Sequence, residues 1–177
     1  MRKSGVSLIQ THLHALIRAL ALPEISLVEL LGRANGLLNQ ATLPKAYATL
    51  VAGRLVTGGR VELANGGHPP PLLADARGVP PVKGGGLPLG LFREAGYDHR
   101  ELFLKPGDTL FLYTDGLTEA ATQEGEYGVS RAAASLRRHA DLPLRELLSA
   151  CRKDLRSFLN GAYSGDDFTL VAIRRME

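Results

Sequence analysis

Two acidic turns beside apolar, strand-like runs are the residues of this 177-residue chain best suited to chemistry. In the first, Asp115 and a glycine follow the run 109–113, and in the second, Asp166 and Asp167 precede the run 168–173. Asp-Gly is a common turn dipeptide, and an Asp before a strand often only caps its own backbone. A carboxylate held at a strand end can also ligate a hard cation, and two strand ends of the same construction favour a divalent-cation site.

Three further residues in or near these motifs invite a role. Gly116 offers its carbonyl to a cation or simply permits the turn, and the turn is slightly favoured. Glu119 lies four residues after Asp115, where a carboxylate either supports a metal ligand or stabilises the start of a helix through its macrodipole. His68 follows an Asn-Gly-Gly sequence and invites a general-acid role, in which it protonates a leaving oxygen.

The elements that must position these residues begin and end with helical patterns. Apolar residues recur at helical spacing over 6–20 and again over 27–38. Pro23 ends the first pattern, and Ser26 is placed to cap the second. The same spacing predicts two later helices, over 130–139 and 144–159.

Strand-like runs fill the rest of the chain. Segments 47–56 and 60–64 flank a Thr-Gly-Gly sequence, whose glycines supply the positive φ of a tight antiparallel hairpin. Helices at both ends with strands between them indicate an α+β fold, in which helices cover antiparallel sheets. No linker or repeat is evident, and the Gly/Pro-rich stretch 78–90 is interpreted as a loop inside a single domain spanning 1–177. Further strands are predicted at 71–74, 99–104, 109–113 and 168–173.

Composition narrows the class of protein. With 45% hydrophobic and 22% charged residues, the chain is typical of a soluble globular domain. No segment reaches the roughly 18 consecutive apolar residues of a membrane span, so no membrane partner is expected. Cys151 is the only cysteine, which excludes an internal disulfide and favours a cytoplasmic location. Because it falls on the apolar face of a helical pattern, we expect Cys151 to be buried.

The formal net charge of +3 raises the question of a nucleic-acid partner. Residues 137–139, together with Arg152, Lys153 and Arg156, are candidates for a basic face. Charged helix faces are usually just solvated, and no interleaved aromatic residues or recognition motif accompany this one. We therefore expect no nucleic-acid partner.

Five motifs, in order along the chain, carry a resemblance to a known family. They make the sequence from about Gly5 to Ile173 similar to metal-dependent protein serine/threonine phosphatases of the stage II sporulation protein E and stress-sigma-factor regulator type. These proteins are relatives of type 2C phosphatases, and five ordered motifs are more specific than any one of them. The motifs are Ala64-Asn-Gly-Gly-His68-Pro-Pro-Pro, Leu87-Pro-Leu-Gly90-Leu, Lys105-Pro-Gly-Asp-Thr-Leu, Tyr113-Thr-Asp115-Gly-Leu-Thr-Glu119-Ala and Gly165-Asp166-Asp-Phe-Thr-Leu170.

The resemblance implies both a fold and a reaction. The fold is a four-layer sandwich, in which helices cover two central antiparallel sheets and the metal site lies at one end of the sheets. Two Mn²⁺ or Mg²⁺ ions, with Asp115 and Asp166 as ligands, activate a water that hydrolyses phosphoserine or phosphothreonine. Asp167 then orients Asp166 or holds a turn, and the motif of His68 is more structural than catalytic. The implied protein substrate is a phosphorylated antagonist of an anti-sigma factor in a partner-switching circuit.

One part of the family pattern is not matched. Family members carry an initial strand hairpin with an Asp-x-Ser-Gly-His-Gly-like motif whose aspartate bridges both metal ions, and here only Gly5-Val6 matches its tail. We therefore expect that the true start of the protein lies upstream, that the chain is a fragment, or that it is a degenerate phosphatase. A sheet that lacks this hairpin exposes an unpaired edge, so we also expect a homodimer or a poorly stable monomer. Two alternatives stay open beside the active phosphatase: a catalytically silent regulatory or binding module, and a hydrolase of small phosphoesters.

Overall fold

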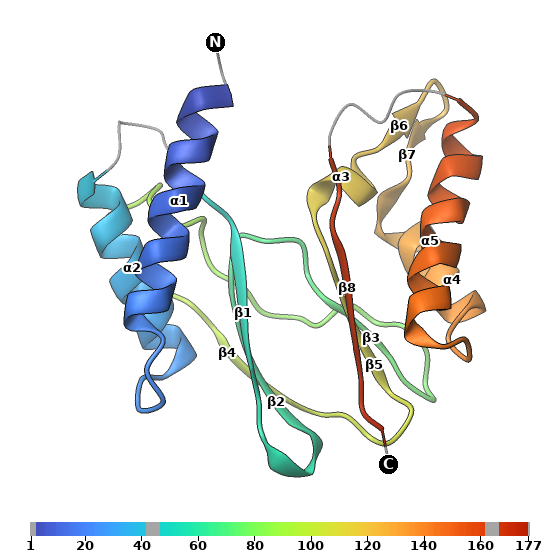
Figure 1. Ribbon diagram of the computed structural model, residues 1–177, viewed down its shortest axis with the longest axis horizontal. Helices are drawn as coiled ribbons and strands as arrows, with labels where there is room; N and C mark the ends of the chain where they lie inside the picture. The colour runs from blue at the N-terminus through green and yellow to red at the C-terminus, as the bar shows by residue number, and fades with distance from the viewer. Residues whose placement is uncertain (1–2, 42–46, 162–166, 177) are drawn as a thin grey trace. The chain divides into compact units, whose positions relative to one another are not determined.

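The computed structural model describes residues 3–41, 47–161 and 167–176 (Figure 1). Its internal contacts divide the chain into two compact units, each assembled from two separate stretches of sequence. The first unit comprises Met1–His68 and Gly84–Phe103, and the second comprises Pro69–Lys83 and Leu104–Glu177. Each unit contains a three-stranded antiparallel sheet and helices that pack on it. The α+β expectation, antiparallel sheets covered by helices, is therefore confirmed, while the single-domain expectation stays a prediction.

In the first unit, two helices pack on a sheet whose strand order is β1-β2-β4. The second helix lies on the sheet through buried residues such as Leu30 and Leu31, and the first helix packs against the second. The serine predicted to cap the second helix does so, because Ser26 Oγ accepts a hydrogen bond of 3.1 Å from the amide of Glu29. The elements are α1 (Lys3–Leu20), α2 (Leu27–Ala41), β1 (Leu50–Leu55), β2 (Arg60–Gly66) and β4 (His99–Phe103).

The predicted hairpin of this unit is also present. Its turn, a short 3-10 segment at Thr57–Gly59, contains two glycines with positive φ, 77° at Gly58 and 85° at Gly59. Only glycine adopts such angles without a steric cost, which is why the sequence could specify this turn by itself.

A buried asparagine fixes a long loop of the first unit. Asn35, 2% exposed on α2, accepts a hydrogen bond of 2.8 Å from the amide of Gly90 and donates one of 3.1 Å to the carbonyl of Phe92. Asn39 donates to the carbonyl of Gly90 over 2.9 Å. The Leu-Pro-Leu-Gly-Leu motif is thus held to the helix by polar contacts that hydrophobic periodicity does not reveal.

In the second unit, α4 and α5 cover one face of a sheet whose strand order is β3-β5-β8 (Figure 1). The core between them contains fully buried side chains from the sheet, such as Phe111, and from the helices, such as Leu136 and Leu147. Burial of this kind is the main source of stability of such a layer. The elements are β3 (Leu72–Ala74), β5 (Thr109–Tyr113), α3 (Asp115–Thr118), β6 (Ala121–Thr122), β7 (Gly125–Glu126), α4 (Gly128–Arg138), α5 (Leu144–Leu159) and β8 (Leu170–Arg174).

Cys151 lies on the inner face of α5 and is 3% exposed, so the expectation of a buried cysteine is confirmed. Burial raises the pKa of its thiol, which keeps the group protonated and unreactive at neutral pH. Among the described residues, no helix combines the length and the apolar character needed to cross a membrane.

Arg174, near the end of β8, joins three parts of the second unit. Its guanidinium donates to Thr109 Oγ1 on β5 over 2.8 Å, to the carbonyl of Leu142 over 2.8 Å and to the carbonyl of Ala140 over 2.6 Å. Both carbonyls belong to the connection between α4 and α5. One side chain therefore ties the helical layer to the sheet.

We expect Arg174→Met to lower the free energy of unfolding by about 2–3 kcal/mol, because hydrogen bonds to charged donors contribute about 1.5–3 kcal/mol and their loss leaves carbonyls unpaired. Urea unfolding measures the change. The control Lys153→Met, at an exposed position of α5, should change stability by less than about 0.5 kcal/mol. Equal effects of the two substitutions would show that the three contacts of Arg174 contribute nothing measurable.

Part of the basic cluster seen in the sequence is neutralised by a carboxylate between α4 and α5. Asp154 Oδ2 accepts hydrogen bonds from Ser135 Oγ at 2.7 Å and Arg138 Nη1 at 3.0 Å, and lies 3.1 Å from His139 Nε2. Arg138 and His139 thus join α4 and its C-terminal end to α5 through Asp154, and these two candidates for a basic face contact a carboxylate.

These contacts of Asp154 predict acid sensitivity. Burial raises the pKa of Asp154, but the hydrogen bonds from Ser135 and His139 and the charge of Arg138 outweigh burial and lower that pKa below its ordinary value of 3.8. The carboxyl of Asp154 therefore binds its proton more tightly in the unfolded chain than in the folded protein. The stabilisation that this carboxylate contributes is complete above about pH 4 and is lost as the pH falls through the lowered pKa. We expect Asp154→Asn to reduce the loss of stability between pH 5 and pH 3, measured by urea unfolding. The exposed Asp141→Asn should leave the pH dependence unchanged.

Candidate functional site

β5 and β8 bring the two acidic turns to the same end of one sheet. The strands pair antiparallel, with Tyr113 opposite Leu170 as the last pair. Beyond that pair, the amide of Thr114 donates to the carbonyl of Thr169 over 3.2 Å, and Thr114 Oγ1 accepts from the amide of Thr169 over 2.9 Å. At this end of the sheet, the chain leaves β5 into the turn that contains Asp115. At the same end, it enters β8 after Asp167.

Gly116 lies in close contact with the second turn. Its amide donates to Asp115 Oδ1 over 2.9 Å, and the residue is buried. A methyl group at position 116 would lie 2.5 Å from the carbonyl oxygen of Asp167 and 3.3 Å from Cβ of Phe168. Real contacts are not this short, so only glycine fits here. The requirement for glycine comes from space and not from a left-handed backbone.

Asp115 is the first residue of α3, a helix of four residues, and its carboxylate is exposed. Within the part of the chain that the structure describes, the amide of Gly116 is the hydrogen-bond partner of this carboxylate. A carboxylate offers about four acceptor positions, so the described residues occupy only a small part of the capacity of Asp115. Thr114, which precedes it, was not singled out by the sequence, although it belongs to the quoted Thr-Asp-Gly motif and holds the two turns together.

The other acidic residues predicted for this site have different outcomes. Asp166 lies outside the described residues. Asp167 is exposed and, through its carbonyl, is in close proximity to Gly116. Glu119 is also exposed and forms the C-terminal cap of α3, where its amide donates to the carbonyl of Asp115 over 2.8 Å. The suggestion that Glu119 stabilises the start of a helix is therefore wrong, because it follows the helix; its role as support for a metal ligand stays a prediction.

His68 lies in the first unit, in a tightly built turn. Asn65, itself 8% exposed, accepts a hydrogen bond of 2.8 Å from the amide of His68 and donates one of 2.8 Å to its carbonyl. The ring Nδ1 lies 3.2 Å from Thr49 Oγ1. These contacts support the structural interpretation of the Gly-His-Pro motif, and the general-acid role stays a prediction.

The donor set of the turns suits a hard cation. Asp115 and Asp167 offer carboxylate oxygens, and the backbone at Gly116 offers a carbonyl, which are the ligand types that Mg²⁺ and Mn²⁺ prefer. Among the described residues, no group of three or more His, Cys, Asp or Glu side chains is arranged to hold a metal ion. The residues at this end of the sheet fit such an ion, and Asp166, which the resemblance assigns as a ligand, lies next to them in the sequence.

Known proteins match this chain over most of its length. The family model described as stage II sporulation protein E (SpoIIE) matches residues 6–176. Among curated relatives, protein IcfG from Synechocystis sp. is 27% identical over 132 residues, which cover 73% of this chain and 21% of that protein. The chain thus spans about a fifth of the length of this relative.

Solved structures show the same fold. The RsbU and RsbW domains of Rv1364c from Mycobacterium tuberculosis match with a TM-score of 0.75 and 28% identity, over 95% of this chain and 47% of that chain. The SiaA-PP2C domain of Pseudomonas aeruginosa has a TM-score of 0.80 at 23% identity, over 95% and 68% of the two chains. The phosphatase domain of SpoIIE from Bacillus subtilis, presoaked with Mn, has a TM-score of 0.64 at 20% identity, over 92% and 71%. At 23% and 20% identity, the last two structures show a similarity of fold alone.

Proposed function

This chain belongs to the stage II sporulation protein E (SpoIIE) family, and from this premise we propose that it is a metal-dependent protein serine/threonine phosphatase domain. The observation that carries the proposal is the contact between the two acidic turns, where Gly116 lies against the carbonyl of Asp167 so closely that no side chain fits. This contact brings the turn of Asp115 close to Asp167, which follows the second proposed ligand, Asp166, in the sequence. In this proposal, the two acids serve one cation site.

Each residue of the site has a separate task in this proposal. Asp115 and Asp166 would hold Mn²⁺ or Mg²⁺, with the carbonyl of Gly116 as a further oxygen donor. When bound, the metal would neutralise the phosphoryl oxygens and supply a water of lowered pKa. Thr114 holds the two turns together through its hydroxyl, which accepts a hydrogen bond from the amide of Thr169. Asp167 would orient the carboxylate of Asp166. His68 remains a prediction as the donor of a proton to the leaving serine oxygen.

The proposed substrate is a phosphorylated antagonist of an anti-sigma factor, in the cytoplasm. Two findings support this substrate class: the family of the chain, and a match to a protein that carries RsbU and RsbW domains in one chain. The similar structure of the SpoIIE phosphatase domain from Bacillus subtilis, which was presoaked with Mn, supports the choice of a divalent metal.

Hydrolysis of p-nitrophenyl phosphate and of a phosphoserine peptide by the whole chain, with and without Mn²⁺, tests the proposal. We expect turnover of both substrates with Mn²⁺ and none after the metal is removed with EDTA. Turnover that EDTA does not reduce would contradict a metal-dependent reaction. Turnover of p-nitrophenyl phosphate without any turnover of phosphopeptides would favour a hydrolase of small phosphoesters.

A catalytically silent binding module is the second candidate. It would keep the fold and hold a phosphorylated partner without turnover. Such a module would bind the phosphopeptide without hydrolysing it, in the presence or absence of Mn²⁺. Binding measured by fluorescence polarisation, next to the hydrolysis assay, separates the two functions.

A further inference from the structure

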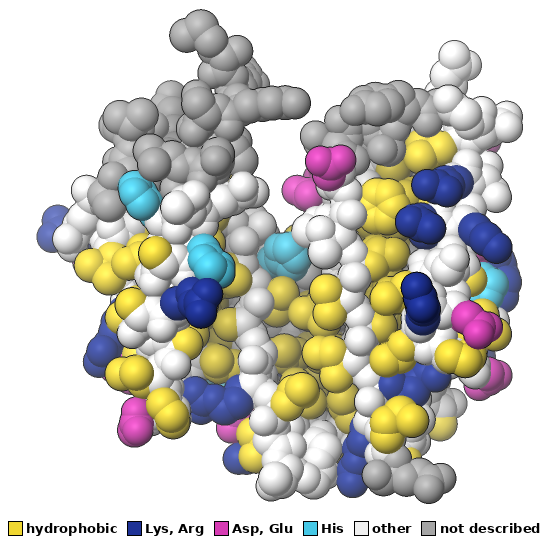
Figure 2. Space-filling model, in the orientation of Figure 1, with side chains coloured by type: hydrophobic (Ala, Val, Ile, Leu, Met, Phe, Trp, Pro, Cys, Tyr) yellow, Lys and Arg dark blue, Asp and Glu magenta, His cyan; other side chains and the backbone are white. Residues whose placement is uncertain are grey.

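A groove of about 390 Å³ lies between α5 and the beginning of β8, within the second unit. Its floor is apolar, because Leu148, Phe168 and Leu170 are half-buried residues that pack against the core of this unit. Arg145, Ser149 and Arg152 of α5 also line it. Figure 2 shows Lys and Arg side chains gathered over α5, beside a row of hydrophobic side chains that faces β8.

The two arginines of the groove form no ion pair with the residues that the structure describes. Arg145 and Arg152 lie seven residues apart, which puts them on the same face of the helix two turns from each other. Both are exposed, and no carboxylate of the described residues forms an ion pair with either. Arg138 on α4 differs, because its charge is already paired with Asp154 over 3.0 Å. Among the described residues, the rim that α5 contributes to the groove is therefore positively charged.

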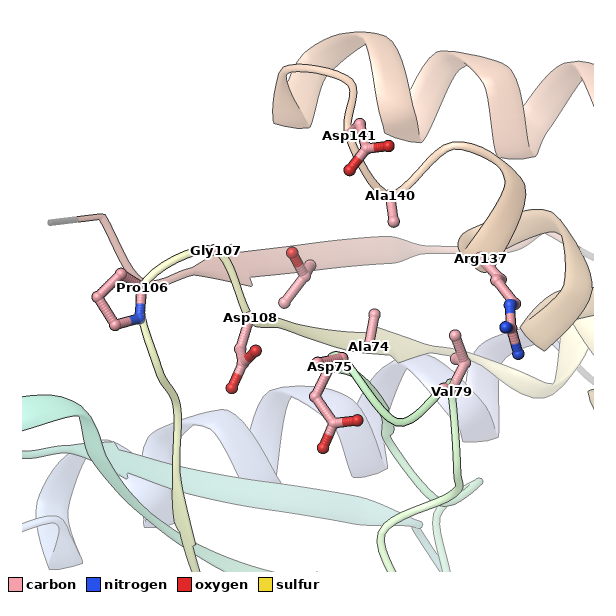
Figure 3. A pocket seen from close by; sticks show the side chains of 12 residues that line it. Ala74, Asp75, Val79, Pro106, Gly107, Asp108, Arg137, Ala140 and Asp141 are labelled. Carbon is pink, nitrogen blue, oxygen red and sulfur yellow. The ribbon is translucent and has the colours of Figure 1, made fainter.

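The groove starts at the proposed metal site. Phe168, which lines it, follows Asp167 directly, and its Cβ is 3.3 Å from the position that a methyl group at Gly116 would take. An extended segment lying in the groove would thus continue toward the exposed carboxylate of Asp115. A second hollow, of about 320 Å³, lies at the opposite end of β5 and β8 and is lined by residues that include Asp75 and Asp108 (Figure 3). It has no such connection to the acidic turns.

We propose that this groove binds an acidic segment of the protein substrate, with an apolar side chain of that segment seated on Leu148, Phe168 and Leu170. Its two arginines match carboxylates, since guanidinium groups bind them with two parallel hydrogen bonds. Exposed ion pairs alone contribute little to binding. The apolar floor adds the burial of apolar surface, which stabilises the complex. The inference rests on the proposed function for the identity of the substrate as a phosphoprotein, and it adds the chemistry by which that substrate is selected.

The test uses the whole chain and binding without catalysis. The probe is a pool of fluorescein-labelled, unphosphorylated peptides in which four Glu residues flank a Leu-Phe pair at varied spacing, measured by fluorescence polarisation in EDTA. Matched pools carry Lys in place of Glu, or Ser in place of Leu and Phe. We expect the acidic apolar pool to bind at least about tenfold more tightly than either matched pool, and Arg145→Glu with Arg152→Glu to abolish the preference.

A second double variant is the matched control. Arg137→Glu with Lys153→Glu makes the same change of charge on α4 and α5, at exposed positions that do not line the groove. It should retain the preference for the acidic pool. An equal loss in both double variants would show a general charge effect, and an unchanged preference in the groove variant would overturn the proposal.

Hydrolysis then separates this inference from the proposed function. With a phosphoserine version of the best peptide, the groove variant should raise KM about tenfold, while its turnover of p-nitrophenyl phosphate stays unchanged. Absence of all turnover by the unmodified chain would contradict the phosphatase proposal and leave the binding result in force. Binding to phosphatidylserine vesicles that depends on the two arginines, without any peptide preference, would assign the groove to a membrane surface and overturn the proposal.

Discussion

Replacing Asp115 by Asn will lower Mn²⁺-dependent hydrolysis of p-nitrophenyl phosphate by about 100-fold or more. The substitution removes one negative charge from the proposed metal site while keeping the size of the side chain. Loss of a residue that merely supports a metal ligand costs about 10–100-fold, so loss of a ligand should cost at least as much. Initial rates over a range of Mn²⁺ concentrations measure the effect, and calorimetric titration should show weaker binding of Mn²⁺ alone.

The exposed Asp141 provides a control for this prediction, because Asp141→Asn removes the same charge outside the acidic turns. It should keep full activity and full Mn²⁺ affinity. If Asp115→Asn retains both, Asp115 is no metal ligand and the site must be sought elsewhere. If it binds Mn²⁺ normally but loses activity, its role is in substrate positioning.

Replacing Gly116 by Ala will have the second-largest effect, on stability and metal binding together. The new methyl group would meet the carbonyl oxygen of Asp167 at 2.5 Å, and backbone on both sides must shift to accept it. Overpacking of this kind costs about 1–3 kcal/mol. Because the shift separates the two acidic turns, we also expect Mn²⁺ affinity to fall by at least about tenfold. Urea unfolding and titration of Mn²⁺ measure the two effects.

Gly96→Ala is the matched control. Apart from its two chain neighbours, no heavy atom of the described residues lies within 4 Å of the Cβ position at Gly96, and its φ lies outside the positive range that alanine avoids. The same change of residue should be neutral or raise stability there, by up to about 1 kcal/mol, through the lower entropy of the unfolded chain. A Gly116→Ala variant that is as stable as the control and binds Mn²⁺ normally would show that the close approach of the turns has no consequence.

Local patterns in the sequence were sufficient for most elements of the fold. The helix predicted over 144–159 has the same bounds as α5, and the glycine-containing turn between 56 and 60 was assigned correctly. These signals are local, because helical faces repeat within four residues and a positive φ belongs to a single residue. The short elements β6, β7 and α3 were missed, since two to four residues are too few to show a period.

The sequence by itself determined the family, the α+β class, the buried cysteine and the two acidic turns as the candidate site. Only the tertiary structure decided which residues those turns contact: Gly116 lies against Asp167, and Asn35 holds a loop more than fifty residues away. It also divided the basic residues between contacts with Asp154 and the rim of a groove. The physical reason is that hydrophobic periodicity specifies which face of an element is buried, whereas polar partners and close backbone contacts depend on which distant segments then pack together.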